Sequence, residues 1–219
     1  MSTISKSGIR TLILDVDSTL TTLEGIDWLA ERRGSDLASR IADLTELAMS
    51  GKVSLDEVFA LRLDVVRPTV ADVRDLAQAY IDSLSTGASK AIGEFGARNI
   101  RTILVSGGIR QAILPLASML GIDEQDVYAV PLLFDDAGEF TCHDEGTPLS
   151  RQRGKLIVAE SLSLERRIAA VGDGMTDLEM KPAVDWFIAF TGVARREEVV
   201  LGADAVVSTF MELQELVLG

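Results

Sequence analysis

Short runs of consecutive apolar residues recur along the chain, and each run gives way to polar or small residues. Three are clear, at Thr11–Val16, Ile100–Val105 and Ile168–Val171, and two shorter ones occupy Trp186–Phe190 and Ala205–Val207. Apolar runs without polar alternation are typical of strands buried on both faces, as in a parallel sheet covered by helices. The pattern therefore predicts five such strands.

Helical patterns separate these strands in the second half of the chain. Apolar positions at helical spacing predict helices at Arg110–Leu120, Arg153–Leu162, Thr176–Met180 and Ala194–Leu201. The stretch Leu132–Thr141 places Asp136-Ala137-Gly138 between apolar flanks, which predicts a hairpin. Alternating strands and helices predict an α/β fold with a doubly wound parallel sheet, a Rossmann-like core.

The segment Thr22–Leu84 differs because its pattern is almost entirely helical. Apolar residues recur at helical spacing, as at Val58, Leu61 and Val65, and Arg67-Pro68-Thr69 marks a break and a new helix start. We expect a helical cap inserted after the first strand. Residues 1–21 and 85–219 would form the core domain, and residues 22–84 the cap.

Composition and charge exclude several classes of function. The chain has 219 residues, 47% of them hydrophobic, which suffices for one large domain or a core with an insertion. A single Cys and a single His exclude a disulfide framework and metal sites that need several of either. A net charge of −13 argues against a nucleic-acid partner. No apolar run is long enough for a signal peptide or a membrane span, so we expect a cytoplasmic protein without a membrane partner.

Acidic residues follow two of the predicted strands at their carboxyl ends, where ligands bind in open α/β sheets. Asp15 and Asp17 close the first apolar run, and Asp173 and Asp177 follow the third. One Asp at such a place is usually a turn former or a helix cap. Four acids at two strand ends instead predict a shared pocket. Their mutual repulsion requires a cation, and Mg²⁺ prefers carboxylate and phosphate oxygens.

Two other segments add groups that suit a phosphate. Ser106-Gly107-Gly108 follows the second strand, where a hydroxyl and backbone N–H groups can hold phosphate oxygens. Lys155 opens the helix before the third strand and supplies a positive charge. Each segment alone is more typical of a capping turn or a solvated side chain. Only their combination with the four acids favours phosphate chemistry.

These segments, in this order, resemble the haloacid dehalogenase (HAD) superfamily of phosphohydrolases. The resemblance rests on DVDST at residues 15–19, Ser106, Lys155 and GDGMTD at residues 172–177. Over nearly the whole chain, the sequence is also similar to the phosphoserine phosphatase family, through EGIDWLA from Glu24 and MSGKVSLDEVFALR ending at Arg62. The resemblance implies a HAD-like α/β core with a helical cap. It also implies hydrolysis of O-phospho-L-serine to L-serine and phosphate, the last step of serine biosynthesis.

The resemblance assigns a catalytic role to each matched core residue. Asp15 would be the nucleophile that forms an aspartyl phosphate, and Asp17 the general acid and later the base. Lys155 and Ser106 would stabilise the phosphoryl oxygens. The implied Mg²⁺ ligands are the Asp15 side chain, the Asp17 backbone carbonyl and the Asp173 side chain. Thr19 and Asp177 would support this site from outside the ligand set.

Substrate recognition falls mainly to the cap in this resemblance. Glu24 would pair with the ammonium of phosphoserine, and Arg62 would hold its carboxylate in a bidentate fork. Met49 and Leu55 would form an apolar lid that excludes water. The implied contacts from the core are Ser106, Gly107 and Thr176.

Two alternatives stay open from the sequence. The first is a related HAD phosphotransferase or phosphatase that acts on another small phosphorylated metabolite, such as phosphohomoserine. The second is a binding protein without catalysis, which would have no need to retain Asp15, Asp17, Lys155 and Asp173 together. The expected partner in either enzymatic case is a small phosphorylated molecule. The oligomeric state is open, with a homodimer as one alternative.

Overall fold

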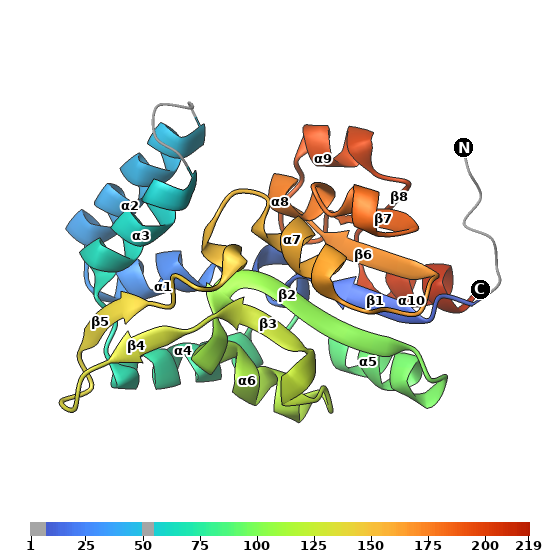
Figure 1. Ribbon diagram of the computed structural model, residues 1–219, viewed down its shortest axis with the longest axis horizontal. Coiled ribbons are helices and arrows are strands. Elements are labelled where there is room, and N and C mark those ends of the chain that lie inside the picture. The colour runs from blue at the N-terminus through green and yellow to red at the C-terminus, as the bar shows by residue number, and fades with distance from the viewer. Residues whose placement is uncertain (1–7, 50–54) are drawn as a thin grey trace.

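The computed structural model describes the backbone of residues 8–49 and 55–219, and the side chains of this part except at residues 42, 45–49 and 55–57. Six strands of the described chain form one parallel sheet in the order β3-β2-β1-β6-β7-β8 (Figure 1). They are β1 (Thr11–Leu14), β2 (Arg101–Ile109), β3 (Val127–Val130), β6 (Ile168–Gly172), β7 (Trp186–Phe190) and β8 (Ala205–Val207). All five predicted strands are confirmed, and β3 is an edge strand that the pattern missed.

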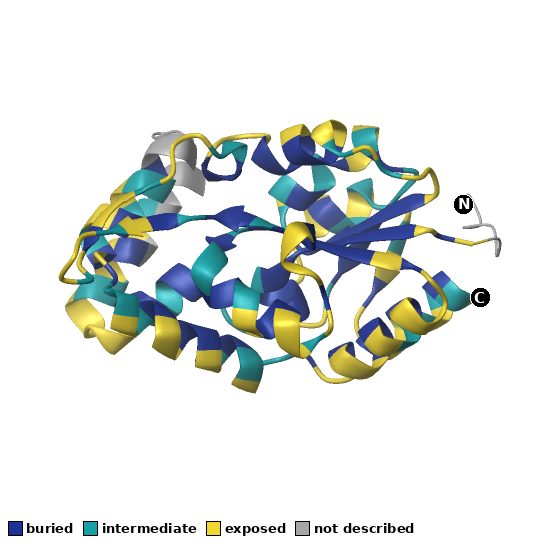
Figure 2. Cartoon of the chain, turned by 60° about the horizontal axis from the view of Figure 1, so that its bottom comes forward, coloured by how far each residue is buried: buried dark blue, intermediate teal, exposed yellow. Residues whose placement is uncertain are grey.

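The interior strands are buried on both faces, which explains their lack of polar alternation. On β1, Leu12 and Leu14 belong to one apolar cluster and Ile13 to the other, and all three are fully buried. Figure 2 shows the strands as the buried centre of the core. Leu14 pairs with Leu104 of β2 on one side and with Val171 of β6 on the other. This register brings the carboxyl ends of three strands to one edge of the sheet.

Helices cover both faces of this sheet. One face carries α7 (Gly154–Ser161), α8 (Met175–Leu178) and α9 (Glu197–Gly202), and the other carries α5 (Ala88–Ala97), α6 (Arg110–Met119) and α10 (Phe210–Leu218) (Figure 1). The four helices predicted in the second half of the chain are confirmed as α6 to α9, with shifts of at most three residues at their ends, whereas α5 was not predicted. Short helical turns occupy Val16–Leu20, Glu124–Asp126, Pro148–Ser150 and Lys181–Ala183. The doubly wound α/β fold follows from this arrangement.

The described residues of the predicted helical insertion form four helices. They are α1 (Gly25–Arg32), α2 (Ser35–Met49), α3 (Leu55–Val66) and α4 (Val70–Asp82). In Figure 1, α1 to α3 stand beyond the end of the sheet, whereas α4 lies along α6. Buried residues of α4, such as Leu76 and Tyr80, join the main apolar cluster of the core. The domain division at residues 22 and 84 stays a prediction, with Thr21 and Leu84 joined by a single antiparallel bridge at its base.

The predicted hairpin is confirmed as β4 (Leu132–Phe134) paired with β5 (Phe140–His143). It lies beside the α1–α3 helices (Figure 1), and the ring of His143 contacts the ring of Phe59 on α3 edge-on, with 5.4 Å between ring centroids. The hairpin therefore connects the core to the helical insertion on one side of the space between them.

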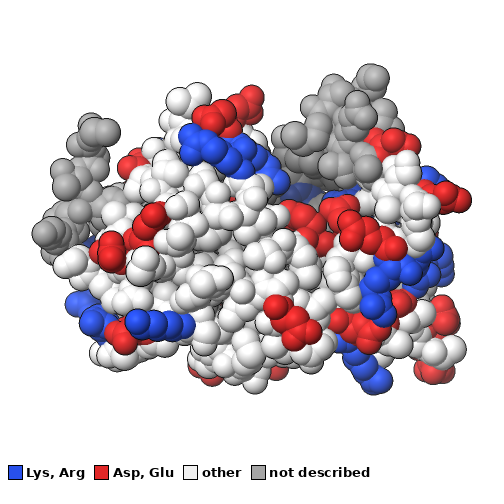
Figure 3. All heavy atoms as spheres, turned by 180° about the vertical axis from the view of Figure 1, so that it is seen from behind, with Lys and Arg blue, Asp and Glu red and all other residues white. Residues whose placement is uncertain are grey.

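The charged surface is mixed on the face shown from behind. Figure 3 shows acidic and basic side chains in small separate clusters there, around a largely uncharged centre. Among the described helices, none has the length and apolar character needed to cross a membrane.

Candidate active site

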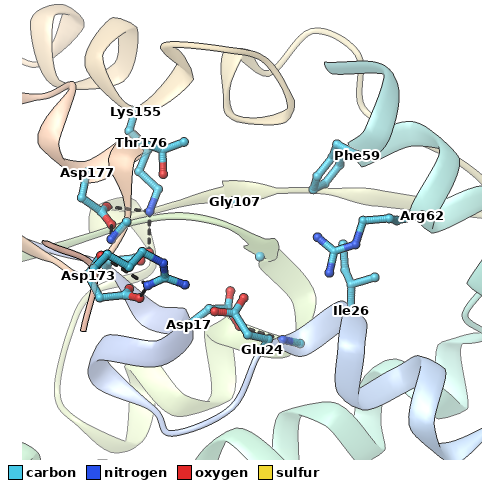
Figure 4. A pocket seen from close by; sticks show the side chains of 15 residues that line it. Asp17, Glu24, Ile26, Phe59, Arg62, Gly107, Lys155, Asp173, Thr176 and Asp177 are labelled. Atoms are coloured by element: carbon cyan, nitrogen blue, oxygen red, sulfur yellow. Dashed lines mark hydrogen bonds and ion pairs between the residues drawn. The ribbon is translucent and has the colours of Figure 1, made fainter. Parts of the chain in front are cut away.

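A cavity of about 310 Å³ opens between the carboxyl edge of the sheet and the helical insertion. The predicted residues that line it from the core are Asp15, Asp17, Lys155, Asp173 and Asp177. Four more predicted residues line its remaining walls, namely Glu24, Arg62, Gly107 and Thr176. Figure 4 shows Lys155, Asp173 and Asp177 on one side of the space, with Phe59 and Arg62 facing them from α3. The acids that the sequence placed at separate strand ends therefore lie in one site.

Lys155 forms the charged centre of the core side. Its Nζ lies 2.7 Å from Asp15 Oδ1 and 2.7 Å from Asp177 Oδ1, and all three side chains are buried. Burial alone lowers the pKa of a lysine, but these two carboxylates outweigh it and raise the pKa of Lys155 above its usual value. Lys155 therefore stays an ammonium and keeps a fixed positive charge beside Asp15.

Asp17 lies in a different environment from Asp15. Its Oδ1 accepts hydrogen bonds from the backbone N–H of Gly25 at 2.8 Å and from the hydroxyl of Tyr80 at 2.7 Å. Burial and the negative charges of Glu24 and Asp15 nevertheless raise the pKa of Asp17 to about 7. Asp17 can therefore hold a proton near neutral pH, as a general acid must.

Two glycines make room for the Asp17 carboxylate. A Cβ on Gly108 would lie 2.6 Å from Asp17 Oδ2, and a Cβ on Gly25 would lie 2.2 Å from the hydroxyl oxygen of Tyr80. Strand β2 runs on through Ser106 to Ile109, beyond the predicted end at Val105, with an irregular register over these residues. A strand continued by two glycines can pass close to the neighbouring acid.

The acidic side of the cavity fits a divalent cation. Carboxylate oxygens of Asp15, Asp173 and Asp177 lie within 4.8 Å of one another, and all three residues are buried. Burial and the nearby charge of Asp15 also raise the pKa of Asp177 to about 7, in spite of Lys155. Among the described residues, five acids line the cavity against three bases, Arg62, Lys155 and Arg196, so the site has room for further positive charge, and Mg²⁺ favours such oxygen donors.

Neighbouring side chains hold Asp173 in this cluster. Thr19 Oγ1 donates a hydrogen bond to Asp173 Oδ1 at 3.2 Å. Arg196, which follows β7, forms an ion pair with Asp173 Oδ2 and donates to the Asp173 backbone carbonyl at 3.3 Å. Thr19 thus contacts directly one of the three acids that could hold a cation.

The helical insertion contributes one acid from its start and one base from α3 to the cavity wall. Glu24 precedes α1, and its Oε1 accepts a hydrogen bond from Ser18 Oγ at 2.6 Å. Arg62 reaches in from α3, and its Nη2 donates to Asp27 Oδ1 at 2.8 Å. Phe59, one turn before Arg62, adds an apolar surface to this wall. The site therefore has one acid, Glu24, close to Asp17, and one base, Arg62, across the cavity from Lys155 (Figure 4).

Among the predicted residues whose side chains are described, Ser106 and Thr19 do not line the cavity. Ser106 is fully buried, accepts from the backbone N–H of Gly108 at 2.9 Å, and donates to Asp17 Oδ2 at 3.4 Å. It acts on Asp17 in this structure, and its predicted contact with phosphate stays a prediction. The side chains of Met49 and Leu55 lie outside the described residues.

The sequence analysis missed four residues of this site: Asp27, Phe59, Tyr80 and Arg196. A search of the segment after the fourth predicted strand could have found Arg196, because strand ends meet at this edge. Tyr80 gave no such signal, since it lies 63 residues from Asp17 in a helix of ordinary amphipathic pattern.

Comparisons with known proteins agree with this geometry. Residues 9–185 match the family described as haloacid dehalogenase-like hydrolases. The chain is 39% identical to a chloroplastic phosphoserine phosphatase of Arabidopsis thaliana, over 94% of this chain and 70% of that protein. It is 38% identical to a phosphoserine phosphatase of Drosophila melanogaster, over 91% and 74%. A phosphoserine phosphohydrolase-like protein of Francisella tularensis has a similar structure, with a TM-score of 0.84, 25% identity, and coverage of 95% and 99%.

Proposed function

The chain belongs to the haloacid dehalogenase-like hydrolases, and from this membership we propose that it hydrolyses O-phospho-L-serine to L-serine and inorganic phosphate. The observation that carries the proposal is the pairing of two sets of groups across one cavity. Lys155 and a cation that the buried acids could hold suit a phosphate, while Glu24 and Arg62 suit the ammonium and carboxylate of an amino acid. Similarity to phosphoserine phosphatases over more than nine-tenths of the chain supports this choice of substrate.

The first step forms an aspartyl phosphate on Asp15. A carboxylate oxygen of Asp15 attacks phosphorus, and the bond between phosphorus and the serine oxygen breaks. Asp17 gives its proton to that leaving oxygen, for which its raised pKa of about 7 is suited. Lys155 stays charged beside Asp15 and stabilises the phosphoryl oxygens during transfer.

The second step returns Asp15 to its free form. Asp17, now a carboxylate, accepts a proton from a water molecule that attacks the phosphorus of the intermediate. The bond between Asp15 and phosphorus breaks, and phosphate leaves. A Mg²⁺ ion held by the Asp15 side chain, the Asp17 carbonyl and Asp173 would supply positive charge against the phosphate in both steps.

Recognition of the amino-acid part relies on opposite charges. Glu24 pairs with the substrate ammonium, and Arg62 binds the carboxylate with its guanidinium fork. Gly107 and Thr176 line the same cavity, where they can contact the substrate. Cytoplasmic location, a place as the last step of serine biosynthesis and a homodimer stay predictions.

We expect L-phosphoserine to be the preferred substrate in a panel of small phosphomonoesters assayed with Mg²⁺ for phosphate release. The panel includes phosphohomoserine, O-phosphoethanolamine and p-nitrophenyl phosphate. Each analogue lengthens the chain or omits a charged group, so each loses a contact with Glu24 or Arg62. Equal kcat/KM values across the panel would refute the substrate assignment but leave the phosphatase chemistry intact.

Replacing Arg62 with Ala is expected to lower kcat/KM for phosphoserine by about 100-fold, because a charge-assisted bidentate contact is lost. Turnover of p-nitrophenyl phosphate, which has no carboxylate, should change by less than about threefold. Arg32→Ala is the matched control, since Arg32 is a cap arginine that pairs with Asp75 away from the cavity. Equal losses on both substrates would disprove the carboxylate contact.

A further inference from the structure

An ion pair joins the two helices that carry the proposed recognition groups. Arg62 Nη2 on α3 lies 2.8 Å from Asp27 Oδ1 on α1, and the Arg62 side chain is only 18% exposed. Asp27 does not line the cavity itself. Its contact with the substrate site therefore runs through Arg62.

Asp27 leaves most of the guanidinium available to a ligand. An arginine offers five N–H donors, and among the described residues Asp27 accepts from Nη2 only. The Nε atom is buried and has no hydrogen-bond partner in the described part of the chain. Arg62 also lines the cavity, and Figure 4 shows its side chain directed into that space. Within the described residues, Arg62 therefore keeps guanidinium donors that Asp27 does not use at the cavity wall, where an acceptor can bind.

Asp27 and Glu24 lie three residues apart at the start of α1. Glu24 is the residue before α1, and Asp27 lies in the first turn of that helix. Residues three apart on a helix are neighbours on its surface, so their spacing is fixed by the backbone. Whatever Asp27 holds is therefore held at a set distance from Glu24. In this structure that group is Arg62.

This spacing matters for the chemistry of an α-amino acid. The ammonium and the carboxylate are bonded to one carbon, so the two groups that recognise them must lie at one short separation. An arginine side chain has many rotamers, and a partner that fixes one of them prepares the guanidinium for binding. The edge-on contact of Phe59 with His143 positions the α3 backbone nearby. Asp27 is the side chain that orients the guanidinium.

We propose that Asp27 is a positioning residue that holds Arg62 at a fixed distance from Glu24, and so sets selectivity for phosphoesters that carry an ammonium and a carboxylate on the same carbon. The inference rests on the function proposed above. It adds a specificity determinant that lies outside the cavity lining.

The test compares Asp27→Ala with the wild type on phosphoserine and on O-phosphoethanolamine, which keeps the ammonium but has no carboxylate. KM for phosphoserine should rise about tenfold, while kcat should stay within about twofold of the wild-type value. The reason is that the lost ion pair orients Arg62 for substrate binding and takes no part in the chemical step. Both constants for O-phosphoethanolamine should stay unchanged. Asp27→Glu keeps the negative charge, so its KM for phosphoserine should lie between the values of the wild type and of Asp27→Ala.

Asp75→Ala is the matched control. Asp75 on α4 forms an ion pair of 2.6 Å with Arg32, which lies on α1 like Asp27 but away from the cavity. It should leave both substrates unaffected. In addition, Asp27→Ala should have no further effect on phosphoserine once Arg62 is replaced with Ala, because Asp27 acts through Arg62.

The outcomes separate this inference from the proposed function. An unchanged phosphoserine KM in Asp27→Ala, with a raised KM in Arg62→Ala, would overturn the positioning role and leave the function intact. Equal losses on both substrates, or full additivity with Arg62→Ala, would also overturn it, since either result indicates a general structural role. If the wild-type enzyme showed no preference for phosphoserine, that result would instead refute the proposed function.

Discussion

Replacing Asp15 with Asn is expected to reduce phosphate release from phosphoserine by roughly 10⁴-fold or more, the scale of losing a catalytic nucleophile. The amide has nearly the same shape as the carboxylate but cannot attack phosphorus to form the covalent intermediate. Steady-state phosphate release measures the loss. An acid-quenched reaction with ³²P-labelled phosphoserine gives the second measurement, because label should stay on the wild-type chain and be absent from the variant.

The same substitution should not harm the fold, and this separates loss of chemistry from loss of structure. The substitution removes the ion pair between Asp15 and Lys155, but Lys155 keeps its ion pair with Asp177. It also relieves the repulsion by which Asp15 adds to the effect of burial on the pKa values of Asp17 and Asp177. Because these effects oppose each other, thermal unfolding of the metal-free variant should occur close to the wild-type temperature. Activity within about tenfold of the wild type in a folded variant would rule out Asp15 as the nucleophile.

Removal of divalent cations is expected to abolish phosphatase activity, and added Mg²⁺ should restore it. The cavity already brings together carboxylates of Asp15, Asp173 and Asp177, and a phosphate adds further negative charge beside them. Lys155 and Arg196 are the cations that contact these acids. Activity measured with EDTA, and with EDTA already saturated with Mg²⁺ as control, checks the requirement.

A binding readout that does not depend on activity accompanies this prediction. Mg²⁺ that binds the folded chain should raise its unfolding temperature in a concentration-dependent way. Asp173→Asn should remove most of that rise, because it deletes one ligand charge from the cluster. Full turnover after exhaustive chelation, or an equal Mg²⁺ effect on Asp173→Asn, would contradict the assignment of this site.

The local pattern of apolar residues predicted those strands that are buried on both faces. The strands at Thr11–Leu14 and Ile168–Gly172 are buried on both faces, so their apolar runs identified them directly. The four-residue strand at Val127–Val130 was missed because it is short and lies at the sheet edge. The second strand extended past its predicted end because Gly107 and Gly108 continue it beside Asp17, which a reading of glycine as a turn signal did not anticipate.

The sequence by itself determined at which edge of the sheet the acids of the proposed active site meet. Parallel strands end at one edge of their sheet, so acids placed after two strands had to meet there, as Asp15 and Asp173 do. Only the tertiary structure decided which distant side chains control these groups. Tyr80 reaches Asp17, Arg196 reaches Asp173, and Asp27 orients Arg62. These contacts depend on how separate helices pack against one another, and the spacing of residues along the chain does not specify that packing.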